Sequence, residues 1–98
     1  MNEFMVLCVD CLNYFENGMN YKEWKNSINT IQPYKHKFKE IILFLLNKKV
    51  INCVDGQFQW NKYYVSCYII KFKRFPNFCR NHLIYFEDYC VSHTKEVD

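Results

Sequence analysis

Cysteine and histidine pairs are the residues of this chain whose types and spacing could do chemistry. Three pairs are each separated by two residues: Cys8 with Cys11, Cys79 with His82, and Cys90 with His93. This spacing lets both side chains of a pair reach one zinc ion. A continuous helix over residues 80–92 would hold the last two pairs about 16 Å apart, too far for a shared ion. The zinc site that the spacing allows therefore consists of Cys8, Cys11, Cys79 and His82.

The alternative is that the cysteines are structural thiols. Cys8 and Cys11 fall on the apolar stripe of an expected helix, where a free cysteine packs as a small hydrophobe. The N-terminus lacks the pattern of a signal peptide, so we expect an intracellular protein, in the cytoplasm or the nucleus, whose six cysteines stay reduced. This interpretation predicts no cofactor, and zinc remains the alternative.

Catalytic chemistry is not indicated by the sequence. Cys8 and Cys11 have the spacing of a redox pair, but the β-α-β pattern of a thioredoxin-like fold does not surround them. Glu87 and Asp88 are adjacent and point to different sides of an expected helix. Two glycines in the whole chain cannot supply a glycine-rich phosphate loop. We therefore expect a protein that is not an enzyme.

Positive charge is concentrated in the middle of the chain. The net charge is +3 over 98 residues, and residues 35–80 alone carry ten basic side chains against two acidic ones, while both ends are acidic. Such asymmetry can mark an anion-binding face, or the acidic ends can fold back on the basic middle. Alanine is absent, and residues with A/T-rich codons abound, which indicates a virus, a phage or another A+T-rich genome as the source.

Four helices and a hairpin are expected to position these residues. Apolar spacing predicts helices over residues 4–15 (with a strand over 4–9 as the alternative), 21–31, 33–48 and 81–92. Asn20 is expected to cap the second helix, and the Asn17-Gly18 pair to end the first. The third helix is apolar on more than one face, so we expect it to be covered on two sides.

The Asp55-Gly56 pair, flanked by alternating residues, predicts a two-residue hairpin turn. This turn fixes the register, with Val54 opposite Gln57 and Ile51 opposite Trp60. One face then carries Ile51, Cys53, Phe58 and Trp60, and the other carries Asn52, Val54, Gln57, Gln59 and Asn61. Residues 63–73 are rich in β-prone types, and we expect them to form an added strand.

The order of three helices followed by a hairpin resembles the winged-helix family. Residues 45–60, LLNKKVINCVDGQFQW, are similar to the recognition-helix exit and the wing of that family. The resemblance covers about residues 4–61 and leaves the added strand and the C-terminal helix for residues 62–98. It implies a small single α+β domain spanning residues 1–98. It also implies that the third helix faces the major groove, with Lys35, Lys39 and His36 near phosphates or bases.

The leading prediction is therefore a regulatory protein that binds nucleic acid. Its predicted contacts are Lys35, Lys39, Lys49, Lys71, Lys73 and Arg74. The alternative is a protein–protein interaction module, because eight Tyr, nine Phe and two Trp exceed what a core of this size easily hides. Such an aromatic surface could bind a host protein or a second copy of the chain. The longest apolar run, residues 41–46, is much shorter than the roughly 20 residues of a membrane span, so no membrane partner is expected.

Overall fold

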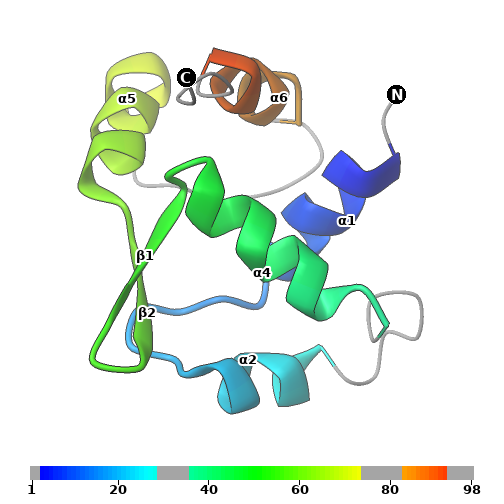
Figure 1. Ribbon diagram of the computed structural model, residues 1–98. Helices are drawn as coiled ribbons and strands as arrows, with labels where there is room; N and C mark the ends of the chain where they lie inside the picture. The colour runs from blue at the N-terminus through cyan, green and yellow to red at the C-terminus, as the bar shows by residue number, and fades with distance from the viewer. Residues whose placement is uncertain (1–2, 29–35, 74–82, 93–98) are drawn as a thin grey trace.

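The computed structural model describes residues 3–28, 36–73 and 83–92 (Figure 1). In this part of the chain five helices and one antiparallel hairpin form a small α+β domain, with a Cα radius of gyration of 12.8 Å. The elements are α1 (Glu3–Leu12), α2 (Tyr21–Ser27), α4 (Phe38–Asn47), β1 (Ile51–Val54), β2 (Gln57–Trp60), α5 (Lys62–Phe72) and α6 (Leu83–Ser92). The order of α1, α2, α4 and hairpin agrees with the predicted order of helices and wing.

The first helix buries one side, as its apolar spacing predicts. The buried residues of α1 are Cys8, Val9, Cys11 and Leu12, so the alternative of a strand over residues 4–9 is wrong. The prediction that the Asn17-Gly18 pair ends this helix is wrong, because α1 ends at Leu12. Gly18 lies in the connection that follows and has a φ of +95°. Glycine adopts this left-handed conformation at little cost, and the chain can therefore turn toward α2.

The second helix begins at a capping box. The Asn20 side chain accepts a hydrogen bond from the Glu23 backbone N–H (2.8 Å), and the Glu23 carboxylate accepts one from the Asn20 N–H (3.0 Å). These bonds fix the start of α2 and direct Trp24 into the core, where it is fully buried. The expected cap at Asn20 is confirmed. The helix ends at Ser27, earlier than expected, and residues 29–31 lie outside the described residues.

The helix predicted over residues 33–48 begins later. In the structure α4 starts at Phe38, while His36 and Lys37 lie in an exposed turn; residues 33–35 are outside the described part. Phe38 is the first side chain of this segment that is buried, and the exposed residues before it add no apolar surface to hold another turn. We expected α4 to be covered on two sides, and the structure shows this only in part. Phe44 packs edge-on against Phe4 of α1, whereas Leu43 is 57% exposed.

The hairpin has the predicted register. Ile51 pairs with Trp60 and Val54 with Gln57, and both turn residues have positive φ angles, 53° at Asp55 and 79° at Gly56. Two positive φ angles define a type I′ turn, whose twist matches that of the strands. The inner face holds Ile51 and Phe58 in the core, but Cys53, which pairs with Phe58, is exposed.

The segment just before α2 lies alongside β2 and extends the hairpin by a short third segment of extended backbone. Gly18 N–H donates to the Phe58 carbonyl (2.8 Å), and Phe58 N–H donates to the Met19 carbonyl (2.7 Å). Asn20 and Gln57 form an antiparallel bridge. These bonds pair the N–H and the carbonyl of Phe58 at the outer edge of β2, and they connect the α1–α2 segment to the hairpin.

The added strand predicted over residues 63–73 is wrong, because residues 62–72 form the helix α5. Asn61 caps this helix by accepting a hydrogen bond from the Tyr63 N–H (2.9 Å). Tyr64 and Tyr68, four residues apart, are fully buried, and the ring of Tyr64 packs edge-on against Tyr89 of α6, with centroids 4.6 Å apart. Packing of this tyrosine stripe outweighs the β propensity of the individual residues.

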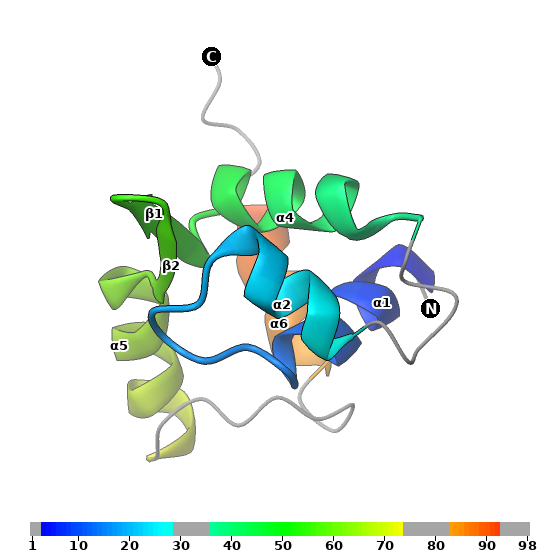
Figure 2. The same ribbon diagram turned by 90° about the horizontal axis from the view of Figure 1, so that it is seen from below.

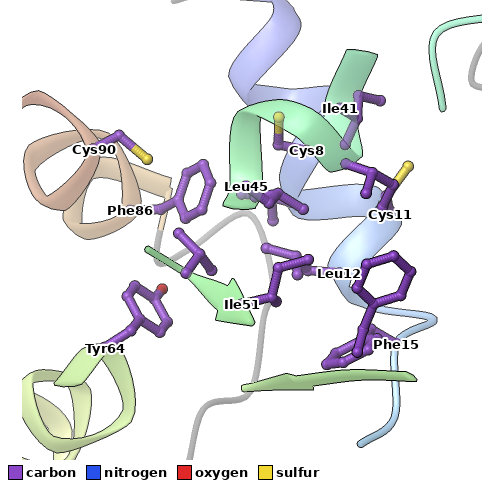
Figure 3. Packing of buried hydrophobic residues seen from close by; sticks show 14 of the residues in the cluster. Cys8, Cys11, Leu12, Phe15, Ile41, Leu45, Ile51, Tyr64, Phe86 and Cys90 are labelled. Atoms are coloured by element: carbon purple, nitrogen blue, oxygen red, sulfur yellow. The ribbon is translucent and has the colours of Figure 1, made fainter. Parts of the chain in front are cut away.

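The last helix, α6, confirms the prediction of a C-terminal helix over residues 83–92, with Leu83, Phe86 and Cys90 all buried; residues 81–82 lie outside the described part. It lies between α1 and α5 (Figure 1). The core is continuous from α1 through α4 and the hairpin to α6, as the side chains in Figure 3 show. No helix in the described ranges is long and apolar enough to cross a membrane.

Candidate functional site

The predicted nucleic-acid contacts do not form one surface. Lys39 lies exposed in the first turn of α4, and Lys49 lies exposed just beyond its end. Lys71 and Lys73 are exposed at the C-terminal end of α5, which Figures 1 and 2 both show far from the first turn of α4. Lys35 and Arg74 lie outside the described residues. The structure thus brings Lys39 and Lys49 onto one helix and its exit turn, and separates them from Lys71 and Lys73.

The outward side of α4 carries two polar residues and one exposed leucine. In Figure 2 this helix runs along one edge of the molecule, with α2, α1 and α6 on its inner side. Glu40, Leu43 and Asn47 are exposed at spacings of three and four residues, so they share this side. Lys37, in the turn before the helix, is exposed as well. Lys48 points elsewhere: it is only 9% exposed, with its ammonium group 5.6 Å from the centre of the Phe44 ring.

The turn between α4 and the hairpin has a fixed shape. Lys49 has a φ of +62°, a left-handed conformation that few non-glycine residues adopt. Tyr89 of α6 donates its hydroxyl to the Lys49 carbonyl over 2.9 Å, and the Asn61 N–H donates to the Val50 carbonyl over 3.0 Å. These two bonds hold the exit of α4 against α6 and the end of β2, so the position of Lys49 is fixed relative to α4.

A cleft that the sequence did not predict lies between the outer face of the hairpin and the first turns of α5. Its volume is about 710 Å³. Four amide side chains line it, those of Asn17, Asn52, Gln59 and Asn61. The hairpin pattern does place Asn52, Gln59 and Asn61 on the outer face, but the segment opposite them was expected to be a strand. The cleft exists because that segment is a helix, whose N-terminus stands beside the hairpin.

Hydrogen bonds orient three of these amides. The Asn17 oxygen accepts from the Trp60 N–H (2.7 Å), and the Asn61 oxygen accepts from the Tyr63 N–H (2.9 Å). The Asn61 nitrogen donates to the Asn52 oxygen (3.0 Å). Because a backbone N–H can only be a donor, the oxygens of Asn17 and Asn61 are identified and their nitrogens are turned away from those bonds.

The predicted zinc ligands are divided between the core and undescribed residues. Cys8 and Cys11 are fully buried, and Cys79 and His82 lie outside the described ranges, so the four-ligand set stays a prediction. Burial raises the pKa of the Cys11 thiol to about 12 and also raises the pKa of the Cys8 thiol. Zinc binds the thiolate, so burial in this apolar setting opposes metal binding. Among the described residues no cluster of three or more candidate ligands is present.

Buried cysteines from two helices belong to the same core. Figure 3 shows Cys8 and Cys11 on α1 and Cys90 on α6, on either side of Leu45 and Phe86. Burial raises the pKa of Cys90 to about 12, even though Lys48 acts in the opposite direction. These three thiols serve as packing groups, whereas Cys53 is exposed and Cys67 is half-buried.

The large aromatic content is mainly internal. Of the aromatic side chains in the described ranges, those with more than about a third of their surface exposed are Tyr14, Tyr21 and Tyr63. The others form a chain of ring contacts; Phe15, for example, packs 4.4 Å from Trp24 and 5.0 Å from Trp60, centroid to centroid. The expectation of a broadly aromatic surface therefore reduces to a few exposed tyrosines.

No known protein family, curated protein or solved structure matches this chain.

Proposed function

We propose that the protein binds nucleic acid, with the outward side of α4 and its exit turn as the contact surface. The supporting observation is that exposed lysines flank α4 at both ends. Lys39 lies in the first turn of α4 and Lys49 two residues beyond its end, and the ten-residue helix is about 15 Å long. The major groove of B-form DNA is about 12 Å wide. Lysines at this separation can contact phosphates on both sides of the groove while the helix lies within it.

The residues between the two lysines have types that read base edges. Asn47 can form two hydrogen bonds with adenine, Glu40 can accept one from cytosine, and Leu43 can contact the methyl group of thymine. All three are exposed on the same side of α4. This side of the helix thus offers base contacts flanked by phosphate contacts, as a recognition helix requires.

The test measures binding of the purified protein to a random-sequence 20-base-pair duplex by fluorescence anisotropy, at low and at moderate salt. Phosphate contacts predict that the logarithm of affinity falls linearly with the logarithm of salt concentration. The Lys39→Glu/Lys49→Glu variant should bind at least about tenfold more weakly, since two contacts become repulsive. Lys71→Glu/Lys73→Glu is the matched control, because it makes the same change in net charge at the distant end of α5.

Circular dichroism must show that each variant is folded at the assay temperature. Absence of salt-dependent binding by the wild-type protein would refute the proposal. An equal loss in the Lys71→Glu/Lys73→Glu control and the Lys39→Glu/Lys49→Glu variant would also refute it, since binding would then depend on overall charge and not on α4.

A protein interface on α5 is the second candidate function. Tyr63 and Ile70 are 58% and 72% exposed, and they lie seven residues apart on the same side of the helix, with Cys67 between them. An apolar stripe of this kind can pack against a partner helix. If it joins two copies of the chain, light scattering should show a dimer at micromolar concentration that is insensitive to salt and is lost in Ile70→Glu.

A further inference from the structure

We propose that the cleft between the hairpin and α5 binds an unpaired uracil or thymine base of a single nucleic-acid strand. This inference rests on the proposed function because it also takes nucleic acid as the partner. The cleft and the outward side of α4 are different surfaces, so the two proposals can be tested separately. It identifies a second class of target, a single strand, and the type of base that the strand presents.

The amide side chains of the cleft offer a ligand mainly hydrogen-bond donors. The oxygens of Asn17 and Asn61 each accept one backbone N–H already, and one N–H of Asn61 is used by Asn52, so the asparagines keep more N–H groups than oxygen lone pairs for a ligand. The oxygen of Asn52 accepts from Asn61, which leaves the Asn52 nitrogen to donate as well. Gln59 can present its carbonyl oxygen as an acceptor beside these donors.

Uracil and thymine have the complementary pattern. Their pairing edge carries two carbonyl oxygens on either side of one ring N–H, so it needs two donors and one acceptor. Adenine has one acceptor and one amino group at this edge, so an amide donor of the cleft would be left unpaired. Cytosine also has two acceptors and one donor, but its amino group lies at the end of the edge, where uracil and thymine carry a carbonyl oxygen that an amide N–H can reach. An unpaired donor in a partly closed site costs binding free energy, and this cost gives the preference for a base with two carbonyls.

The shape of the cleft suits a flat ring. Val54 of β1 and Val65 of α5 line it from the hairpin and from the helix, so apolar groups can contact the faces of a base while the amides contact its edge. Single-stranded bases are commonly bound in this manner, with their faces against apolar side chains and their edges hydrogen-bonded. A volume of about 710 Å³ falls within the range of 300–1,000 Å³ that is typical of small-ligand sites.

The charge at the cleft favours a nucleotide over a cationic ligand. Lys62, in the first turn of α5, is exposed and lines the cleft. None of the described lining residues has a carboxylate. Lys62 can therefore contact a backbone phosphate next to the bound base.

The experiment compares labelled dT15, dA15 and dC15 by fluorescence anisotropy at constant low salt. The three strands have the same number of phosphates, so any difference in affinity reports the bases. We expect dT15 to bind at least about tenfold more tightly than dA15, which corresponds to one or two well-placed hydrogen bonds. Thymidine should compete with dT15 more strongly than deoxyadenosine does, which would show that the base itself is recognised.

Two variants test the cleft directly. Gln59→Ala should weaken binding of dT15 about tenfold, and Asn52→Asp, which replaces a donor by an acceptor of the same shape, should reduce the preference for dT15 over dA15. Gln57→Ala is the matched control, because Gln57 is an exposed amide on the same face of β2 but does not line the cleft. Affinity for dT15 in this control should stay within about twofold of wild type, and circular dichroism should show all three variants folded.

The outcomes separate this inference from the function proposed for α4. Equal affinity for the three strands, equal competition by the two nucleosides, or no effect of Gln59→Ala would each overturn the base site, even if duplex binding persists. A preference for dT15 that survives in Lys39→Glu/Lys49→Glu, while duplex binding in the wild type is absent, would overturn the α4 proposal and support the cleft.

Discussion

The hydroxyl of Tyr89 donates a hydrogen bond to the carbonyl oxygen of Lys49, with 2.9 Å between the two oxygen atoms. This bond connects residues 40 positions apart and joins α6 to the exit turn of α4. Lys49 has a positive φ, so its carbonyl points in a direction that the α4 ladder cannot satisfy. The C-terminal helix therefore helps to define the geometry of the proposed contact surface, although it follows the helices and hairpin of residues 3–60 in the sequence.

Replacing Tyr89 by phenylalanine should lower the free energy of unfolding by about 1 kcal/mol, because the part-buried hydrogen bond to the Lys49 carbonyl is lost while the ring packing is kept. Urea denaturation measures this change. Tyr14→Phe serves as the control, since Tyr14 is 42% exposed and should show a change within about 0.5 kcal/mol. Equal effects of the two substitutions would contradict a stabilising role for the Tyr89 hydroxyl.

Trp24→Phe should destabilise the fold by about 2–3 kcal/mol. The substitution removes the indole N–H that donates to the Cys11 carbonyl over 3.0 Å, and it leaves space beside Phe15. Ile28→Val, in the same part of the core, should cost only about 1 kcal/mol, because it removes one methyl group and no hydrogen bond. Chemical denaturation of both variants checks the order, and a smaller loss for Trp24→Phe than for Ile28→Val would refute it.

Gly56→Ala should lower the free energy of unfolding by about 1 kcal/mol. Nothing lies within 4 Å of the position that an added Cβ would occupy, so the cost comes from the φ of +79° and not from a clash. Asp55→Asn, at the other turn residue, should be nearly neutral, because asparagine also adopts left-handed angles readily. Thermal melting distinguishes the two, and a neutral alanine would show that the turn can relax to another type.

Stability should fall at alkaline pH, and Cys90 should account for part of the fall. Burial holds its folded-state pKa at about 12, whereas an unfolded thiol titrates near pH 8.5. Above pH 8.5 the unfolded state binds fewer protons than the folded state, so the free energy of unfolding decreases as pH rises toward 12. The slope contributed by one fully buried thiol is at most about 1.4 kcal/mol per pH unit.

Urea denaturation at pH 7.5 and pH 10 measures this dependence. Cys90→Ala should reduce the slope between the two pH values, whatever its stability at neutral pH. Cys53→Ala is the matched control, because Cys53 is exposed at the hairpin and should leave the slope unchanged. An unaltered slope in Cys90→Ala would show that other groups, such as the buried tyrosines, account for the whole dependence.

Local signals in the sequence predict most of the winged-helix-like portion. The Asp55-Gly56 pair fixes the hairpin turn and its register, and the register in turn decides that Ile51 and Phe58 face the core. Asn20 predicts the start of α2 through its side-chain oxygen. Such signals are reliable because turn and cap geometry depend on a few adjacent residues, whose conformational preferences do not need the rest of the chain.

The segment after the hairpin shows where local signals fail. Tyr, Val and Ile between residues 63 and 70 favour a strand by propensity, but the structure contains a helix. Tyr64 and Tyr68 lie on one side of a strand as well as on one side of a helix, so their spacing does not separate the two. The cap at Asn61 is the local signal that could have indicated the helix, because its oxygen accepts from the Tyr63 N–H.

The sequence by itself determined the hairpin, the starts and inner faces of several helices, and the residue types available for binding. Only the tertiary structure decided that residues 62–72 are helical, because burial of Tyr64 and Tyr68 against α6 supplies the stabilisation that local propensity does not. That decision also created the cleft, since the amides of the hairpin acquire a facing wall only when Asn61 begins a helix. For the same reason the lysines of the basic middle separate into two distant groups, and charge counted along the chain does not show this separation.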